Sequence, residues 1–364
     1  MRQGPQDNHM SYLFRGLTLP GAGGLLAKAD AAATRLAAKL AALDLSAVPL
    51  STPSQTLLAD KLAHPVPTMQ VSTYLLVQAL RLTDKPPEQV VLCDYGGGTG
   101  LLSFLALEMG VGQVLYVDLA QEKHADALAL AAALGYALPH AVLGDVDAAL
   151  AHVQKHGITP DVVCSFDVLE HIYDLPAHFT ALDAISPGPL AYVMASTANQ
   201  FHAGIRRRWL DVQRRAETQG YGGPAYVAVR TQMIRERLAE RTAKLPPHTL
   251  EELARATRGR HRQDVHRAVD ALLDHAIMPQ PPEHPTNTCN PATGSWLDRL
   301  FDHRELLPLL KQHGFEARIA YGLYGDSPHQ TRTLLAEAVN RAITLAGPLA
   351  RFAAPFYTLL ARRR

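Results

Sequence analysis

Apolar residues are spaced in two different ways along this chain, and the change occurs near residue 85. Before it, alanine and leucine dominate and the charges recur on one side, which predicts helices. After it, short runs rich in valine and leucine alternate with longer helical stretches. The predicted strands are 88–95, 113–119 and 140–146, and the predicted helices between them are 100–110 and 121–135.

Alternating strands and helices need crossover connections, which favour a parallel, doubly wound sheet. The alternation continues with a strand that begins after Pro160 and another at 190–199. It then breaks into Arg-rich helical sequence and resumes near residue 296. The elements predicted after that point are a helix at 302–315, a strand at 316–325, a helix at 330–345 and a last strand at 355–363.

We therefore expect an α/β chain with a Rossmann-like doubly wound sheet and two helical additions. The expected parts are an N-terminal helical cap at 1–85, a Rossmann-like core at 86–199, a helical insertion with a substrate loop at 200–295, and the rest of the core at 296–364.

Composition narrows the class of protein. The chain has 364 residues, of which 47% are hydrophobic and 19% charged, as in ordinary soluble globular proteins. The formal net charge is only +1, so the overall charge does not attract the protein to nucleic acid or to anionic lipid. The three cysteines lie far apart, which argues against a disulfide framework or a zinc cage. Because the N-terminus lacks the apolar core of a signal peptide, we expect a cytoplasmic location.

A glycine-rich loop, CDYGGGTG, follows the first predicted core strand and precedes a helix. It is not a phosphate-binding P-loop, because no lysine follows it. The dinucleotide pattern GxGxxG is matched only in part, since Ser103 stands where the third glycine would be. Asp94, Gly96, Gly98 and Gly100 instead form DxGxGxG.

This loop resembles motif I of the class I S-adenosylmethionine (SAM)-dependent methyltransferases, and VLEH at 168–171 resembles the small-molecule branch of that family. SAM has no phosphate, so no lysine is needed, and its carboxylate suits bare backbone near a helix N-terminus. The resemblance covers residues 86–199 and 296–364 and implies an antiparallel last strand.

The resemblance also implies which residues hold SAM. Asp118 would accept both ribose hydroxyls, and Asp145 and the Val146 N–H would contact adenine. Taken singly, either aspartate is explained as a helix cap or as a solvated loop end, and it is their joint order at strand ends that favours binding. The cofactor residues expected are Asp94, Gly96, Gly97, Gly98, Gly100, Asp118, Leu119, Asp145, Val146 and Phe166.

Candidate catalytic residues follow the fourth and fifth predicted strands. His171 has the intrinsic pKa of a general base, roughly 6.5, although a structural role is an equal alternative. The ring of Tyr173 is suited either to a cation–π contact with the sulfonium or to core packing. Ser196 and Asn199 end the fifth strand, where substrates bind in such folds, and a loop cap is the alternative for both.

The loop HPTNTCNPATGSW is dense in hydrogen-bonding side chains, and with the insertion it is a candidate cover for the acceptor. His284, Asn287, Cys289 and Trp296 are the substrate-contact candidates. We expect no metal, because His284 and Cys289 lack companion ligands. Arginines such as Arg206 to Arg208 are interleaved with acids, so a solvated helical face is favoured over nucleic-acid binding.

The function expected is methyl transfer from SAM to an oxygen or nitrogen of a small molecule or biosynthetic intermediate. A first alternative keeps SAM but has its own amine attack the methionine chain, as azetidine-2-carboxylate synthases do, with release of methylthioadenosine. A second alternative is a SAM-binding protein without catalysis. The expected partner is thus a small molecule, with no nucleic acid and no membrane, and the oligomeric state stays open.

Overall fold

The computed structural model describes residues 11–326 and 330–364 and divides them into two compact units. The first, called the sheet unit, comprises the chain up to Val168 together with Pro176–Ala195 and His303–Arg364. The second, called the helical unit, comprises Leu169–Leu175 and Ser196–Asp302. Residues 169–171 of the VLEH segment, expected within the core, thus group with the insertion, whereas Val168 belongs to the sheet unit. The first ten residues of the expected N-terminal cap lie outside the described residues.

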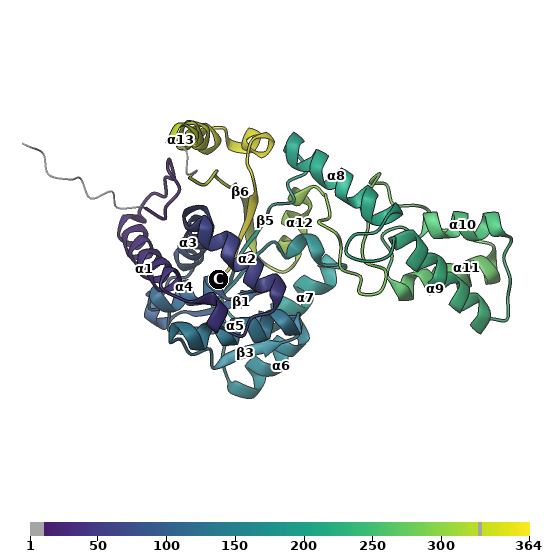
Figure 1. The fold of residues 1–364 in the computed structure, drawn as a ribbon, viewed down its shortest axis with the longest axis horizontal. Helices are drawn as coiled ribbons and strands as arrows, with labels where there is room; N and C mark the ends of the chain where they lie inside the picture. Colours follow the sequence, from purple (N-terminus) through teal and green to yellow (C-terminus); the bar gives the residue numbers. More distant parts are fainter. Residues whose placement is uncertain (1–10, 327–329) are drawn as a thin grey trace, which may run out of the picture. The chain divides into compact units, whose positions relative to one another are not determined.

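The sheet unit is built on a seven-stranded sheet of order β3-β2-β1-β4-β5-β7-β6 (Figure 1). Neighbouring strands from β3 to β5 are parallel, whereas β6 and β7 are antiparallel to each other. This confirms the predicted Rossmann-like sheet and its antiparallel end. The strands are β1 (Val91–Tyr95), β2 (Gln113–Asp118), β3 (His140–Leu143), β4 (Val162–Phe166), β5 (Leu190–Ser196), β6 (Glu316–Tyr321) and β7 (Tyr357–Arg363).

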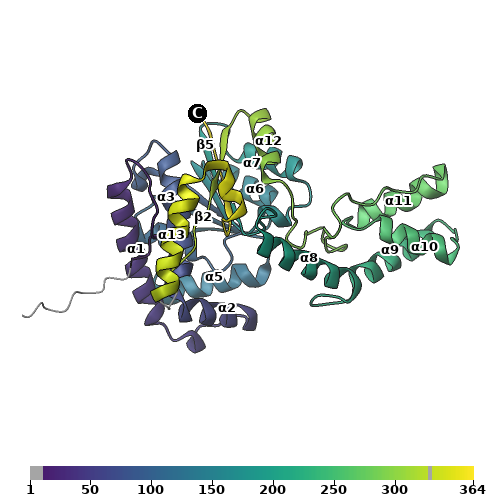
Figure 2. The same cartoon turned by 90° about the horizontal axis from the view of Figure 1, so that it is seen from above.

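Helices cover both faces of this sheet (Figures 1 and 2). Several end at a glycine in the left-handed conformation, such as Gly135 and Gly157, which a side chain would strain. The crossover and C-terminal helices are α4 (Leu101–Glu108), α5 (Gln121–Leu134), α6 (Val146–His156), α7 (Leu175–Ile185), α12 (Leu306–Gln312) and α13 (Gln330–Leu345). Short 3₁₀ helices are η1 (Leu45–Ala47), η2 (Pro87–Gln89), η3 (Leu169–His171), η4 (His303–Glu305) and η5 (Gly347–Phe352).

The N-terminal helices share the core of the sheet unit. They are α1 (Gly23–Ala41), α2 (Thr52–Ala63) and α3 (Pro65–Leu82), and both α1 and α3 contact α4. Leu36 and Leu76, from α1 and α3, are fully buried in the same apolar cluster as Leu92 and Phe104. Because each such side chain gains about 1.5–3 kcal/mol on burial, these helices stabilise the sheet rather than forming a separate domain.

The helical unit has its own core. It contains α8 (Ala203–Thr218), α9 (Tyr226–Glu240), α10 (Pro247–Ala256) and α11 (Arg262–His275), with α9 in contact with the other three (Figures 1 and 2). Ile234, Leu253 and Val265 are fully buried between α9, α10 and α11. The guanidinium of Arg230 is buried as well and is paired with Glu217. The helices are therefore held by both apolar packing and internal ion pairs.

Within residues 11–326 and 330–364, no helix combines the length and the apolar character needed to cross a bilayer.

Candidate functional site

The glycine loop turns the chain from β1 into α4 with bare backbone. Gly96 has a φ of +71°, and a Cβ there would collide with the side chain of Val168. A Cβ on Gly97 would lie 2.6 Å from Cε2 of Tyr116. The N–H groups of Gly96 and Gly97 both donate to the carbonyl of Val117, at 2.8 and 3.1 Å. The loop is thus pressed against β2, and only glycine fits.

Asp94 fastens this loop to the helix that follows it. Its Oδ2 accepts hydrogen bonds from the backbone N–H and the hydroxyl of Ser103, at 3.1 and 2.7 Å. Burial raises the pKa of Asp94 to about 6, although the bonds from Ser103 favour the ionised form. Ser103 is therefore a functional residue that sequence reasoning passed over. Its signal was the departure from glycine at the third position of GxGxxG.

Asp118, the last residue of β2, orients the same loop from the neighbouring strand. Its Oδ2 accepts from the N–H of Gly98 at 2.8 Å, and its Oδ1 accepts from the N–H of Ala120 at 2.8 Å. The hydroxyl of Tyr116 donates to the carbonyl of Gly98 at 2.6 Å. Each carboxylate oxygen can accept one further hydrogen bond. Asp118 therefore combines loop positioning with spare acceptor capacity.

The parallel register brings the ends of β2 and β3 together. Asp118 is paired with Leu143, and the N–H of Gly144 donates to the Asp118 carbonyl at 2.9 Å. Asp145 follows directly and so lies at the same edge of the sheet as Asp118. Leu119 is 74% exposed at this edge, although it is a large apolar side chain. An apolar surface beside two carboxylates suits a ligand with a flat heterocycle and hydroxyls.

Asp145 caps helix α6. Its Oδ1 accepts from the N–H groups of Asp147 and Ala148, at 3.1 and 3.3 Å. The helix-cap explanation is therefore present in the structure, and it leaves the second carboxylate oxygen available to a donor. Val146 is the first residue of α6, a position whose N–H has no partner within the helix. Both groups suit the adenine edge that the resemblance assigns to them.

Aromatic residues border the same end of the sheet. Tyr95 precedes the glycine loop and lies 5.3 Å from the ring of His178, centroid to centroid. Burial lowers the pKa of His178 to about 4, so this imidazole is neutral at pH 7. Its Nε2 is buried and has no hydrogen-bond partner in the described part of the chain. Phe166 ends β4 and packs edge-on against Phe356. Sequence reasoning missed Tyr95 and His178.

The proposed catalytic and substrate residues all belong to the helical unit. His171 is held by the backbone of Trp296: its Nδ1 lies 2.8 Å from the Trp296 carbonyl, and its own carbonyl accepts from the Trp296 N–H at 3.1 Å. A carbonyl only accepts, so Nδ1 carries the proton and Nε2 carries the lone pair. Glu170 and Asp298 each place a carboxylate oxygen within 4.8 Å of a His171 nitrogen. This is the arrangement of an oriented base.

Ser196 and Asn199 are fully buried and bonded within the unit. The hydroxyl of Ser196 donates to Oε1 of Glu170 at 2.6 Å and accepts from the N–H of Ala198 at 3.0 Å. Oδ1 of Asn199 accepts from the N–H of Phe201 at 3.1 Å. Both residues therefore shape the turn after β5, as the loop-cap alternative anticipated.

Tyr173 lies in a stack of rings. Its ring is parallel to that of His261, with centroids 4.4 Å apart, and nearly parallel to that of Trp296 at 5.9 Å. Its hydroxyl donates to Asp264. Burial and the neighbouring Asp264 raise the pKa of Tyr173, so the phenol stays protonated at neutral pH. Tyr173 joins η3 to α11 and the loop at Trp296.

The substrate-loop candidates differ in how far the fold occupies them. The amide of Asn287 bonds to Leu300 through both its atoms, at 2.8 and 3.0 Å, and accepts from Gln213 at 3.3 Å. Nδ1 of His284 accepts from the N–H of Asn287 at 3.0 Å. Burial and nearby arginines lower the pKa of His284 to about 4. Cys289 is buried. The amide of Asn287 is therefore used in hydrogen bonds that hold the loop. The imidazole of His284 is neutral, and its Nε2 is buried without a hydrogen-bond partner among the described residues.

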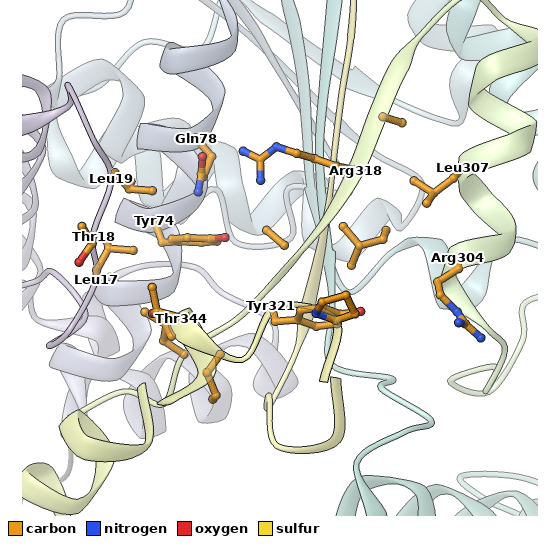
Figure 3. Close-up of a pocket in the computed structure, with 17 residues that line it drawn as sticks. Leu17, Thr18, Leu19, Tyr74, Gln78, Arg304, Leu307, Arg318, Tyr321 and Thr344 are labelled. Carbon is orange, nitrogen blue, oxygen red and sulfur yellow. The ribbon is translucent and has the colours of Figure 1, made fainter. Parts of the chain in front are cut away.

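A separate cavity of about 580 Å³ lies along β6 in the sheet unit (Figure 3). Its walls come from the segment before α1, from α3, from β6 and from the end of α13. Figure 3 shows Arg318 extending from β6 toward Gln78 of α3. None of the glycine-loop residues lines this cavity, so it is distinct from the strand ends that carry Asp118 and Asp145.

Comparison with known proteins agrees with this geometry. A family model described as a methyltransferase domain matches residues 70–257, slightly more than half of the chain. No curated protein sequence matches the chain.

Several solved structures are similar to this chain at low sequence identity. One is a SAM-dependent methyltransferase from Mesorhizobium loti, with 15% identity, coverage of 80% of this chain and 96% of that one, and a TM-score of 0.38. Another is the plantazolicin methyltransferase BpumL in complex with an analogue and S-adenosylhomocysteine, with 13% identity, coverage of 91% and 98%, and a TM-score of 0.36. A chain described as a SAM-dependent methyltransferase from Streptococcus mutans is 16% identical with a TM-score of 0.30; the match covers 39% of the present chain and 38% of that chain's length.

The family match spans α3, the glycine loop, the carboxylates at the strand ends and the η3 segment, which are the features that the geometry singles out. The cofactor of this family is SAM, and its members are transferases. The chain belongs to the methyltransferase-domain family and is a SAM-dependent methyltransferase with a Rossmann-like fold.

Proposed function

We propose that this enzyme methylates an oxygen or nitrogen atom of a small molecule or biosynthetic intermediate. The observation that carries the proposal is the clamp on His171 by Trp296, which leaves the Nε2 lone pair as the basic site. Hydroxyl and amine acceptors lose a proton during methylation, so they need such a base, whereas a thiolate has no proton to lose. The neighbouring carboxylates of Glu170 and Asp298 stabilise the imidazolium that forms.

The residues at the strand ends fit SAM, and we assign them as follows. The bare glycine backbone at the start of α4 would admit the methionine part, because the space that a Cβ on Gly98 would enter is open. The remaining lone pairs of Asp118 accept the ribose hydroxyls. Leu119 would cover the adenine, and Asp145 and Val146 would bind its polar edge. When bound, SAM supplies an electrophilic methyl group on a sulfonium.

The chain's own contribution to the reaction is alignment and proton removal. Holding the acceptor in line with the methyl group is worth about 7–11 kcal/mol in favourable cases. Nε2 of His171 takes the proton that the acceptor releases, a step that typically contributes about 10²–10⁴-fold in rate. The Trp296 carbonyl keeps the ring in the basic tautomer throughout.

The charge distribution supports a small acceptor rather than nucleic acid. Arginines of the insertion are engaged by acids of the same unit: Arg237 forms a bidentate pair with Asp270 at 2.7 and 3.0 Å, and Arg241 contacts Asp270 and Asp274. Such pairs leave less free positive charge for phosphates. The free thiols of the three cysteines support the proposed cytoplasmic location.

Mass spectrometry of enzyme incubated with SAM, first alone and then with a panel of hydroxyl- and amine-bearing compounds, tests the proposal. We expect S-adenosylhomocysteine and a product heavier by one methylene only when an acceptor is present. Methylthioadenosine and a four-carbon cyclic amino acid from SAM alone would instead establish the cyclising reaction and overturn methyl transfer. Methylation confined to thiol acceptors would overturn the role of His171.

A further inference from the structure

Three histidines converge on the surface of the sheet unit, away from every residue assigned above. His140 is the first residue of β3, and His152 and His156 lie one turn apart near the end of α6. One ring nitrogen from each lies within 4.8 Å of the others. The ring centroids of His152 and His156 are 4.3 Å apart, and that of His140 lies 5.4 and 5.7 Å from them.

The spacing of the nitrogens matches the coordination of a metal ion. Nδ1 of His140 lies 3.2 Å from Nε2 of His152. Two nitrogens bound to one zinc ion at 2.0–2.1 Å in a tetrahedron are separated by about 3.3 Å. His156 sits one helical turn after His152, the i, i+4 spacing that places two ligands on one helix face. A ring nitrogen of His156 lies within 4.8 Å of those of the other two histidines.

We propose that His140, His152 and His156 form a binding site for a divalent transition-metal ion, with zinc as the expected occupant. Three neutral imidazoles suit zinc, copper, nickel or cobalt, whereas magnesium and calcium prefer oxygen ligands. Three protein ligands leave a fourth position for water. Sequence analysis predicted no metal, because His284 and Cys289 lack companion ligands. It did not single out His140 and His152, which are 12 residues apart and are joined only by the fold.

Metal binding at this cluster requires that the coordinating nitrogen of each imidazole is free of its proton. In the metal-free state, one proton lies between His140 and His152. When a metal binds there, that proton moves to the other ring nitrogen of its own histidine or to solvent, which needs no co-reactant.

The place of the site in the fold indicates a structural role. It joins the edge strand β3 to the last turn of α6, so a bound ion cross-links two elements. Asp145 caps the opposite end of α6, about 16 Å away at 1.5 Å per residue. We therefore expect the metal to raise the stability of the sheet unit without altering affinity for SAM.

Calorimetric titration of untagged full-length enzyme with zinc chloride alone tests the site. We expect one zinc per chain, and a shift of the thermal unfolding midpoint to higher temperature when zinc is added. His156→Gln should weaken binding at least about tenfold, since even residues that only support metal ligands cost that much. His156 is exposed, so this variant should fold normally; His152→Gln should give the same loss.

His275→Gln is the matched control, because His275 also ends an exposed helix turn but has no histidine cluster around it among the described residues. It should bind zinc like the wild type. Cobalt added in place of zinc should produce the visible absorption of a low-symmetry site in the wild type and not in His156→Gln. Failure of the wild type to bind zinc, or full binding by His156→Gln, would overturn the proposal.

Discussion

The two units hold their polar side chains in different ways. In the sheet unit, Asp94 and Asp118 accept hydrogen bonds from backbone N–H groups of the loop that they position. In the helical unit, Ser196 and Tyr173 bond to side chains, those of Glu170 and Asp264. Every sequence that adopts the loop provides its backbone N–H donors. A side-chain partner, in contrast, requires a particular residue at a particular position. The cofactor end thus depends mainly on backbone donors, whereas the acceptor end adds specific side-chain pairs to backbone contacts such as that of His171 with Trp296.

If this division is correct, changes in the helical unit should alter turnover more than SAM binding. The largest effect is expected for His171→Gln, which keeps a polar side chain but removes the base. We expect kcat to fall by about 10²–10⁴-fold, the usual worth of general base catalysis. Steady-state kinetics with an identified acceptor measures this, and calorimetry should find SAM affinity unchanged. The control is His275→Gln. A parallel loss of SAM affinity would erase the distinction between the units.

Asp118→Ala should have the reverse signature. It removes a carboxylate that orients Gly98 and the bonds proposed to the ribose, each charged hydrogen bond being worth about 1.5–3 kcal/mol. We expect the Kd for SAM to rise roughly 100-fold or more while the far-ultraviolet circular dichroism is preserved. Asp147→Ala, an exposed acid nearby, serves as the control. Calorimetric affinity equal to that of the wild type would refute the ribose assignment.

Gly97→Ala tests whether the glycine loop requires a residue without a side chain, and its expected effect is smaller than that of Asp118→Ala. The added methyl would lie 2.6 Å from Tyr116 Cε2 and 2.9 Å from Asp94 Oδ2, and overpacking of this kind typically costs about 1–3 kcal/mol. We expect a lower unfolding midpoint and weaker SAM binding. Gly24→Ala, with no atom near its Cβ, should be neutral or stabilising. Equal unfolding midpoints for the two variants would show that the loop accommodates the added methyl group without a loss of stability, and would contradict this prediction.

The smallest effect concerns pH. The raised pKa of Asp94, about 6, means that its contribution to stability is present in acid and is lost as pH rises from about 4 to 6. The lowered pKa of His178, about 4, acts oppositely, because its contribution is lost as pH falls from about 6.5 to 4. The two partly cancel. We expect Asp94→Asn to steepen the loss of stability in acid, as measured by melting at several pH values; a slope like that of the wild type would contradict this.

Much of the sheet unit could be predicted because its signals are local. The run before Tyr95, the glycines after it and the helix at 330–345 are each visible within a short window, and all lie where expected. Alternation then limits the topology to a few choices. Asp118 was predictable for the same reason, as the last residue of a strand next to the loop.

The helical unit could not be predicted to the same degree, because its contacts join distant residues. His171 meets Trp296 across 125 residues, and Tyr173 meets Asp264 across 91. No short pattern encodes such pairs. For the same reason, the sequence did not indicate the neutral state of His178 or the histidine cluster at His140. Both depend on how helices pack against strands.

The clamp between His171 and Trp296 also has a consequence for folding. Helices α9, α10 and α11 contact one another over short sequence separations and can form early. Closing the 125-residue loop costs more entropy, so the clamp is expected to form last. Amide hydrogens at η3 and Trp296 should then exchange faster than those in α9. We therefore expect the contact between His171 and Trp296 to form last during folding and to break first on heating. Activity should then be lost at a lower temperature than the one at which the protein unfolds.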